Sequence, residues 1–420
     1  MRRLLLITAI APRFDAGGGG EIRQAHLIEA LSARFEVHML LAGRLRDQRV
    51  GRLLASVTEV PAAPAADPPG PIRRRVRDVR WAVVERSSDE LARHRAVRRA
   101  LSQQIHARPE IDVVCVEYIS LAPLLPAHRD QLWSLTLHNL PSEMARHNAR
   151  IAPGARQRAM QSLQERNARR VEHWAARAYD LVVTVSAQDA ALLPVPAAVV
   201  TNGVDTVRFQ PTPVPDSGRV VFTGALHTSP NRDGILWFAS EVWPAVRARV
   251  PDAKLEIVGS RPPADVLALT RLDGVEVKPD VPDIAPFLAS ARVAVVPLRI
   301  GSGSRLKALE AMATGRPVVG TSVGLGGLEL EPGRDALIAD EPDALGEQVA
   351  RCLADSELAA SLGAAGRRLV EDRYSWRQIG ADYASLLEAR IAGRTSPPSS
   401  SDTVVTNSRP IRSQPKRSTT

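Results

Sequence analysis

Short apolar runs alternate with amphipathic stretches along most of the chain, and this alternation predicts β-strands that take turns with α-helices. Residues 1–11 form an apolar run that Pro12 ends, as expected of a buried parallel strand. Residues 15–20 are a glycine-rich loop, and residues 21–34 place their apolar side chains on one face of a helix. Together these segments make one βα unit, the repeating element of a wound α/β sheet.

The same pattern predicts two separate sheets. In the first half, further strands are expected at residues 35–41, 112–117, 133–137 and 181–185. In the second half, strands are expected at residues 219–223, 254–258, 275–277, 293–296 and 317–320. A proline-rich connection lies between the two series, at residues 194–215. Because ligands of wound α/β sheets bind outside the carboxyl ends of the strands, the two halves should enclose a cleft.

The length of the chain sets the number of domains. At 420 residues, it exceeds the size at which a single hydrophobic core stops growing. We therefore expect an N-terminal domain at residues 1–195 and a C-terminal domain at residues 196–374. Residues 393–420 are rich in Ser, Pro and Arg and lack apolar periodicity, so they are predicted to be a disordered tail.

The cysteines and the apolar runs indicate the cellular compartment in which the protein is expected. Cys115 falls in a predicted strand and Cys352 in a predicted helix, so both should be buried and reduced, as in the cytoplasm. The first residues mimic a signal peptide, but no small-residue cleavage site follows them. No run approaches the roughly 18 apolar residues that a membrane-spanning helix needs. We expect a cytoplasmic protein that is soluble or peripheral at the inner face of the membrane.

The net charge of +9 raises the question of an acidic partner. Nucleic acid is not expected, because the chain has no finger, helix-turn-helix or RNA-recognition pattern and its aromatic content is only 4%. The basic segment at residues 72–99 contains many arginines together with Trp81, Val83 and Val84. This segment resembles a surface attracted to anionic lipid. A solvated arginine face explains it equally well.

The strongest chemical signal is the stretch GSGSRLKALEAMATG at residues 301–315. It follows an apolar run at residues 291–297, so it reads as a loop between a strand and a helix that begins near Arg305. Gly301 and Gly303 let a phosphate approach the backbone at a helix N-terminus. The serines of the same loop, Ser302 and Ser304, can contribute hydroxyl groups.

The charged residues that follow extend this signal. Arg305 and Lys307 add positive charge, and Glu310 lies about one turn further along the helix, where a carboxylate can accept hydrogen bonds from a ribose diol. Phosphate and ribose together indicate a nucleotide. The alternative is an ordinary strand-turn-helix connection with a solvated ion pair between Lys307 and Glu310.

Several segments, taken together and in this order, resemble the GT-B glycosyltransferases of family 4, also called glycosyltransferase group 1. They are AGGGGEIRQ at residues 16–24, VVTVSAQD at 182–189, TNGVDTVRF at 201–209, FTGALHTSPNRDGILWF at 222–238, LEAMATGRPVVGT at 309–321 and EDRYSWRQI at 371–379. The resemblance implies two Rossmann-like doubly wound α/β domains that face a central cleft. It places the acceptor mainly on the first domain and the nucleotide-sugar donor on the second. It also implies that a last helix, here about residues 375–391, packs back on the first domain.

The chain departs from the family pattern at three positions. Many members carry an arginine and a lysine where this sequence has Ala225 and Asn231. They also carry two glutamates with seven residues between them, whereas here Ser302 stands at the first position and Glu310 at the second. We expect Arg305 and Lys307 to supply the missing charge at the diphosphate, and Asn231 remains a weaker donor-site candidate.

In the first domain, the resemblance points to two further sites. Gly18 and Gly19 belong to the loop that approaches the diphosphate and sugar in the family, and Arg23 follows it. His138 comes directly after a predicted strand and resembles the cleft histidine of the family. It can bind the sugar or the phosphate, or assist the acceptor. A structural hydrogen bond is the alternative role for His138, and a flexible turn is the alternative for the glycines.

Two segments of the second domain complete the list. Ser229 is predicted to be the N-cap of a helix, with Pro230 at its first position. Val281 lies in the loop at residues 280–283, where the family holds the nucleobase through backbone contacts. Such contacts do not identify the base.

The predicted function is a hexosyltransferase-like, retaining glycosyltransferase of bacterial polysaccharide biosynthesis. It would move a sugar from a nucleotide-sugar donor to a glycan, lipid-linked or small-molecule acceptor, and the resemblance implies that it needs no metal or other cofactor. Two alternatives remain at this point. One is a sugar-nucleotide epimerase or phosphorylase on the same fold, and the other is a non-catalytic module that binds a nucleotide or a membrane.

Overall fold

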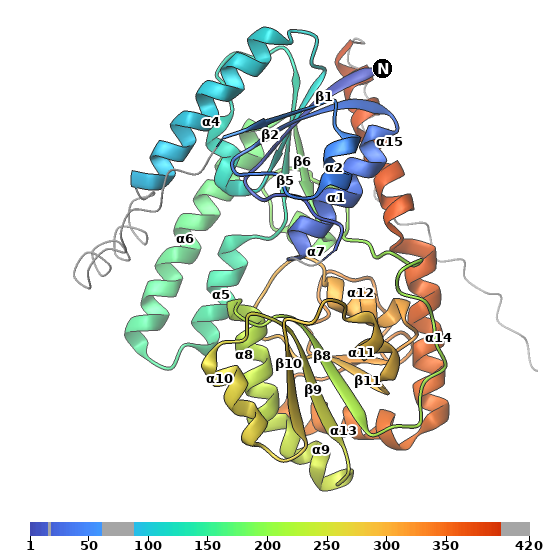
Figure 1. Ribbon diagram of the computed structural model, residues 1–420. Helices are drawn as coiled ribbons and strands as arrows, with labels where there is room; N and C mark the ends of the chain where they lie inside the picture. The colour runs from blue at the N-terminus through green and yellow to red at the C-terminus, as the bar shows by residue number, and fades with distance from the viewer. Residues whose placement is uncertain (16–17, 61–87, 396–420) are drawn as a thin grey trace, which may run out of the picture.

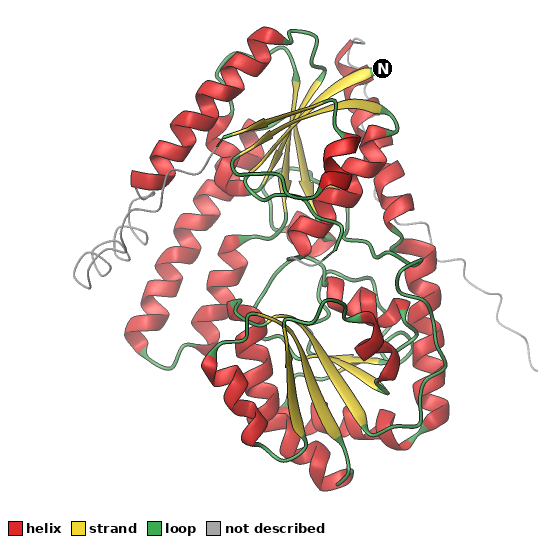
Figure 2. Ribbon diagram, viewed as in Figure 1, coloured by secondary structure: helices red, strands yellow, loops and turns green. Residues whose placement is uncertain are grey.

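The computed structural model describes residues 1–15, 18–60 and 88–395. It contains two parallel β-sheets with helices on both faces, one above the other in Figure 1, and the carboxyl ends of the two sets of strands face each other. Figure 2, which is coloured by secondary structure, shows the same two sheets flanked by helices. The α/β class predicted from the alternating pattern is confirmed.

The first sheet has seven strands in the order β3-β2-β1-β4-β5-β6-β7. The strands are β1 (Arg2–Thr8), β2 (Phe35–Leu41), β3 (Ser56–Glu59), β4 (Val113–Glu117), β5 (Leu132–Leu137), β6 (Leu181–Thr184) and β7 (Ala198–Val199). The helices around it are α1 (Gly19–Ser32), α2 (Gln48–Leu53), α4 (Ser88–Ala107), α5 (Pro141–Ile151), α6 (Ala155–Ala178) and α7 (Ala187–Ala191). The short strands β3 and β7 were not predicted, because four and two residues are too few to show a period.

The alternation of side chains along β1 explains why this sheet is covered on both faces. Leu4 and Leu6 pack into a cluster with α1, whereas Leu5 and Ile7 pack into a second cluster on the opposite face. Successive side chains of a strand point to opposite faces, so a strand buried on both sides must be apolar at every position. The run LLLI at residues 4–7 shows this pattern in the sequence.

The second sheet has six strands in the order β10-β9-β8-β11-β12-β13. They are β8 (Arg219–Ala225), β9 (Lys254–Ser260), β10 (Val275–Pro279), β11 (Val293–Val296), β12 (Val318–Gly320) and β13 (Leu337–Ile338). Its helices are α8 (Ser229–Trp237), α9 (Trp243–Arg249), α10 (Ala264–Leu267), α11 (Ala285–Ser290), α12 (Leu306–Ala313), α13 (Pro342–Ala354) and α14 (Ser356–Arg373). One continuous apolar core holds this sheet and its helices together.

Helix α15 (Trp376–Thr395) returns to the first sheet. Its side chains Tyr383 and Leu387 are buried in the same cluster as α1, and Arg34 forms an ion pair with Glu388. The helix includes residues 393–395, which the sequence pattern assigned to a disordered tail, and residues 396–420 lie outside the described part of the chain.

The two connections between the sheets run beside each other. The backbone N–H of Val204 donates to the carbonyl of Tyr374 at 2.7 Å, and a Cβ added at Gly203 would lie 2.8 Å from the ring of Trp376. The hinge between the domains is therefore a packed contact of two segments, one before β8 and one before α15.

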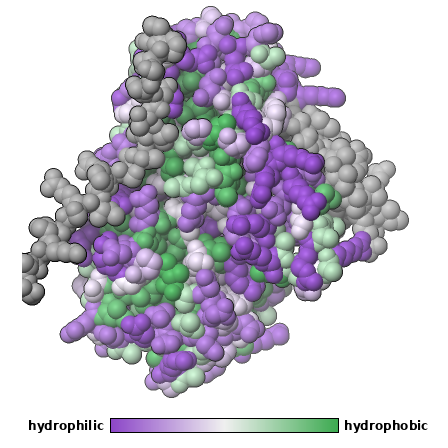
Figure 3. Space-filling view, turned by 180° about the vertical axis from the view of Figure 1, so that it is seen from behind, coloured by the Kyte–Doolittle hydropathy of each residue, from purple (hydrophilic) through white to green (hydrophobic). Residues whose placement is uncertain are grey.

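Cys115 and Cys352 are buried free thiols, as predicted, and burial raises the pKa of each to about 12. None of the helices in the described ranges is both long and apolar enough to cross a membrane. On the face seen in Figure 3, hydrophilic side chains cover much of the right half of the view, and hydrophobic ones show nearer the middle.

Candidate active site

The loop after β11 meets the first domain directly. Gly303 has a φ of +77°, and a Cβ at this position would lie 2.8 Å from the carbonyl oxygen of His138 and 2.9 Å from Val185. Both the backbone conformation and the close approach favour glycine. The structure thus brings the predicted donor loop against the predicted cleft histidine.

Hydrogen bonds to the first domain and the linker hold this loop. The hydroxyl of Ser302 accepts from the backbone N–H of Leu140 at 2.7 Å, and the hydroxyl of Ser304 accepts from the N–H of Asn202 at 3.1 Å. The N–H of Gly301 donates to Nδ1 of His147 at 3.4 Å. The two domains are therefore closed on each other at this loop.

Arg305 is placed to hold the loop in shape. It is the N-cap residue of α12, and its guanidinium donates to the carbonyl oxygens of Ser302 and, at 3.3 Å, of Val323. Burial lowers its pKa to about 10, while Asp189 opposes that shift. Its Nε is buried and has no partner among the described residues.

Lys307 extends in another direction, to the end of β8. Its Nζ donates to Oδ1 of Asn231 at 2.7 Å and lies 4.0 Å from the centre of the Phe222 ring. A Cβ added at Gly224 would lie 2.8 Å from the same Nζ. Burial and the charge of Arg305 lower the pKa of Lys307 to about 7, against the opposing effect of Glu310.

Asn231 lies in the first turn of α8 and faces this amine. Its Nδ2 donates to the carbonyl of Ala225 at 3.0 Å, so Oδ1 is the atom that accepts the hydrogen bond from Nζ of Lys307. The N-cap of α8 is Thr228, and Ser229 is the first helical residue, so the predicted N-cap was wrong by one position. Pro230 accordingly occupies the second position, where the absent N–H also costs no helical hydrogen bond.

Glu310 lies further along α12, beside an ion pair between Arg208 and Asp283 of 2.8 Å. Burial raises the pKa of Glu310 to about 7, although Arg208 and Lys307 both oppose this. A small cavity of about 20 Å³ touches Glu310, His26 and Arg208.

A larger groove of about 570 Å³ opens next to this small cavity. It is lined from both domains, by residues that include Phe14, Arg49, Asp205, Arg208 and Asp283. Val281, two residues before Asp283, is half-buried. The groove thus joins the neighbourhood of Glu310 to the loop that was expected to hold the base.

The glycine loop of the first domain faces α12. Gly18 is the N-cap residue of α1, and a Cβ added there would meet nothing within 4 Å. A Cβ at Gly19 would lie 2.8 Å from Leu306, the first residue of α12, and one at Gly20 would lie 2.0 Å from the hydroxyl of Tyr118. Of these three glycines, Gly19 is therefore the one whose backbone lies against the second domain.

His138 follows β5 and is almost fully buried. Its Nε2 lies 2.5 Å from Oε2 of Glu117, the last residue of β4, and its ring stacks on that of Tyr118 with 4.0 Å between the ring centres. Sequence reasoning missed Glu117 and Tyr118. The one available signal was an acidic residue at the carboxyl end of an otherwise apolar strand.

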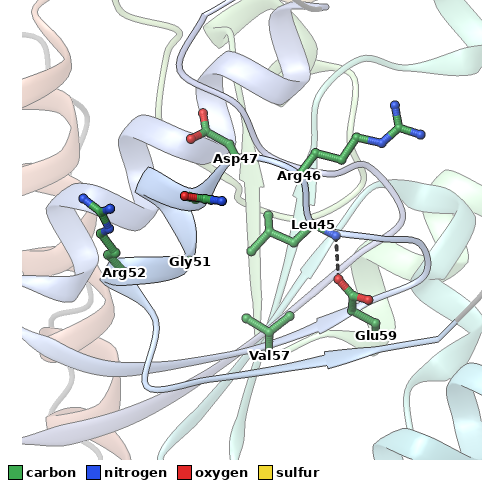
Figure 4. Close-up of a pocket in the computed structure, with 8 residues that line it drawn as sticks. Leu45, Arg46, Asp47, Gly51, Arg52, Val57 and Glu59 are labelled. Atoms are coloured by element: carbon green, nitrogen blue, oxygen red, sulfur yellow. Dashed lines mark hydrogen bonds between the residues drawn. The ribbon is translucent and has the colours of Figure 1, made fainter.

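Another surface groove, of about 630 Å³, lies beside α2 (Figure 4). Leu45, Asp47, Val57 and Glu59 are among its lining residues, and Glu59 accepts from the N–H of Leu45 at 2.8 Å. None of the predicted site residues lines it.

Comparison with known proteins identifies the second domain. Residues 217–355 match the family model of the Glycosyl transferases group 1. This part of the chain belongs to that family. The match contains β8, the loop at residues 301–304, Lys307, Asn231 and Glu310.

Curated relatives of the chain include mannosyltransferases. A GDP-mannose-dependent alpha-(1-6)-phosphatidylinositol monomannoside mannosyltransferase of Mycolicibacterium smegmatis is 31% identical over 218 residues, which is 46% of this chain and 56% of that protein. A lipopolysaccharide core biosynthesis mannosyltransferase of Rhizobium leguminosarum is 27% identical over 51% of this chain and 67% of its own length. The chain thus matches little more than half the length of the first relative.

Solved structures match nearly the whole chain. Sucrose-phosphate synthase from Thermosynechococcus elongatus covers 94% of it with a TM-score of 0.72 at 21% identity, and all of that structure is matched. HepE of Anabaena, in complex with UDP and glucose, covers 93% with a TM-score of 0.63 at 13% identity. These matches confirm the predicted GT-B fold.

Proposed function

We propose that the protein is a retaining glycosyltransferase that uses GDP-mannose to mannosylate a lipid-linked or glycan acceptor. One observation carries the proposal: Lys307 places a cation on Asn231 at the end of β8, inside the segment that matches the family. The names of the mannosyltransferase relatives favour mannose as the sugar and GDP as the carrier.

The reaction needs negative charge to be stabilised on a departing diphosphate. In the proposed reaction, the acceptor hydroxyl attacks C1 of the sugar from the face that the diphosphate leaves. The bond between C1 and the phosphate oxygen breaks, and the hydroxyl proton passes to that oxygen. Lys307, preorganised by Asn231 in a partly buried site, stabilises the leaving charge. The reaction as proposed involves no covalent enzyme nucleophile and no metal.

Other residues of the cleft are proposed to bind the ribose and the base of the donor. We assign the ribose to Glu310 and the base to the groove beside Val281 and Asp283. A cavity of about 20 Å³ at Glu310 is far smaller than the roughly 300 Å³ of a typical small-molecule site. Donor binding in this scheme therefore requires this cavity to widen towards the neighbouring groove of about 570 Å³.

For the acceptor side, we propose contact with an anionic membrane surface on the cytoplasmic face. The predicted basic segment at residues 72–99 lies largely outside the described residues, and its exposed members on α4 are Arg95, Arg98 and Arg99. Helix α6 offers a clearer surface. Trp174 and Leu163 are 47% and 37% exposed, although both are large and apolar.

These two residues belong to one stripe of α6. The stripe consists of Ala159, Leu163, Arg166, Arg170, Trp174 and Arg177, which are all exposed. Their spacing of three and four residues places them on the same face, and that face contains no acidic residue. Arginines together with Trp and Leu on one helix face are typical of helices that lie on anionic lipid.

Nucleotide release tests the proposed activity. The purified chain should release GDP from GDP-mannose when it is given a lipid extract or a polyisoprenyl or glycolipid acceptor, and NMR of the product should show an α-linked sugar. GDP should also raise the melting temperature more than UDP, ADP or dTDP at equal concentration. If no nucleotide binds and no sugar is transferred from purine or pyrimidine donors, the proposal is wrong.

A further inference from the structure

Glu117 and His138 form a buried pair at the carboxyl ends of two adjacent strands. β4 and β5 are parallel neighbours, so Glu117 at the end of one strand lies beside the residue that follows the other. The carboxyl of Glu117 is 2% exposed, and its Oε1 accepts from the hydroxyl of Thr136 at 3.0 Å. Its Oε2 lies 2.5 Å from Nε2 of His138.

The surroundings of the pair restrict the histidine ring further. Tyr118 stacks on the His138 ring with 13° between the two planes. Tyr118 itself has a φ of +78°, a backbone conformation that residues other than glycine rarely take. Gly20 leaves the space that the hydroxyl of Tyr118 occupies. Residues in such strained conformations are concentrated at functional sites.

The hydrogen bond assigns the proton of the imidazole. An ionised carboxylate only accepts hydrogen bonds, so Nε2 must carry the hydrogen that faces Glu117. Burial and the nearby charge of Arg23 lower the pKa of His138, while Glu117 raises it, and the net direction is downward. In the neutral ring, Nδ1 then has no hydrogen and can only accept.

We propose that Glu117 is a positioning residue that fixes the Nε2–H tautomer of His138, so that Nδ1 accepts a hydrogen bond from a substrate hydroxyl. Phosphate oxygens accept hydrogen bonds and offer no hydrogen to Nδ1, so this arrangement assigns His138 to a hydroxyl and not to the diphosphate. The identity of that hydroxyl, on the donor sugar or on the acceptor, rests on the proposed glycosyltransferase function.

The tautomer can be measured directly on the full-length protein. In long-range ¹H–¹⁵N spectra of ¹⁵N-histidine-labelled protein near pH 7, His138 should show the Nε2–H pattern, with His138→Ala used to assign its signals. In Glu117→Gln the pattern should shift towards the other tautomer or a mixture. Exposed His106, which faces the carbonyl of Ser102, should keep its signals in both proteins. An Nδ1–H tautomer or an imidazolium ring in the wild type would overturn the proposal, and this readout does not depend on activity.

Kinetics then separates positioning from a general structural effect. Glu117→Gln should lower kcat/KM by roughly ten- to a hundredfold, the range expected for loss of one hydrogen bond to a charged group. Binding of the nucleoside diphosphate alone, which has no sugar hydroxyl at this site, should remain unchanged. In the double variant that also carries His138→Ala, Glu117→Gln should cause no further fall in kcat/KM. Additive losses, or an equal loss of diphosphate binding, would show that Glu117 does not act through His138.

Two assays identify the hydroxyl. If it belongs to the donor sugar, Glu117→Gln should slow both donor hydrolysis and transfer. If it belongs to the acceptor, only transfer should slow. An absence of transfer by the wild type from every nucleotide sugar would refute the proposed function, whereas the spectra of His138 would still decide the role of Glu117.

Discussion

Nζ of Lys307, on α12, lies 2.7 Å from Oδ1 of Asn231, on α8. The arginine and lysine common in the family are absent at positions 225 and 231, yet an amine from another helix reaches the same end of β8. The amide of Asn231 orients that amine, and the ring of Phe222 lies beneath it. Charge can therefore be supplied at one point of the cleft from a different place in the chain.

Replacing this amine should weaken donor binding. In the proposed donor site, Lys307→Ala would remove one charge-assisted contact with the diphosphate, and such a contact contributes about 1.5 to 3 kcal/mol. We expect the Kd of the nucleoside diphosphate to rise roughly ten- to a hundredfold by calorimetry, with a similar fall in kcat/KM.

Lys278→Ala is the matched control for this change. Lys278 belongs to the same domain, its side chain is 40% exposed, and it pairs with Glu276 at 2.8 Å. Its loss should leave both constants within twofold of the wild type. Equal effects of the two substitutions would exclude Lys307 from the diphosphate site.

Nucleotide binding should also move protons, in opposite directions on the two sides of pH 7. Lys307 has a pKa lowered to about 7, so a bound diphosphate should restore its proton, and binding at pH 8 should take up protons. Glu310 has a pKa raised to about 7, and a carboxylate that binds the ribose must be ionised, so binding at pH 6 should release a proton. Calorimetry in buffers of different ionisation enthalpy measures both, and Lys307→Ala should abolish the uptake at pH 8 alone.

The same shifts affect stability without ligand. Between pH 7 and 10.5 the unfolded chain holds the Lys307 proton that the folded chain has lost. This group therefore increases the free energy of unfolding as pH rises. Between pH 4.5 and 7 the folded chain holds the extra proton on Glu310, so the contribution of that group falls as pH rises. Lys307 and Glu310, which are both half-buried, thus make the free energy of unfolding change with pH in opposite directions on the two sides of pH 7.

Arg305 should behave differently from Lys307. Because its guanidinium holds the carbonyls of Ser302 and Val323, Arg305→Ala should lower the melting temperature as well as donor affinity. Lys307→Ala should lower affinity with little loss of melting temperature. Differential scanning calorimetry beside nucleotide titration separates the two. If Arg305→Ala weakens donor binding and leaves the melting temperature unchanged, Arg305 acts on the ligand and not on the loop.

The sequence predicted the major strands and the candidate loops because each is a local pattern: continuous apolar runs for buried strands, and glycines beside charged residues for the loops. It did not predict which residues the side chains of these loops contact. The two cations look equivalent in GSGSRLKALE, but one turns back to the loop and the other crosses to Asn231. Pairings between residues far apart in the chain, such as Ser302 with Leu140, depend on how the two domains close.

The stripe on α6 should respond to anionic lipid. In co-sedimentation with vesicles that contain phosphatidylglycerol, binding of the wild type should fall with salt and should be absent for pure phosphatidylcholine. Replacing Arg166, Arg170 and Arg177 by glutamine should weaken vesicle binding at least tenfold, and adding Trp174→Ala should weaken it further.

Three exposed arginines of the second domain provide the control set for this surface. Replacing Arg249, Arg271 and Arg351 by glutamine removes the same net charge from the other domain. Equal losses from the two sets would show that net charge alone causes binding. Self-association that disappears with Trp174→Ala would assign the stripe to a second copy of the chain.

A methyl group at Gly303 should keep the two domains apart. Gly303→Ala places a Cβ 2.8 Å from the carbonyl of His138 in a backbone conformation that already disfavours a side chain. Gly333 has a similar φ of +85°, but nothing lies within 4 Å of a Cβ added there, so Gly333→Ala carries the backbone cost alone, about 1 kcal/mol. We expect both variants to lose a few degrees of melting temperature. Only Gly303→Ala should lose turnover by more than tenfold and show a larger radius of gyration by small-angle X-ray scattering. If both variants remain equally active and equally compact, contact between the donor loop and the first domain is not required for transfer.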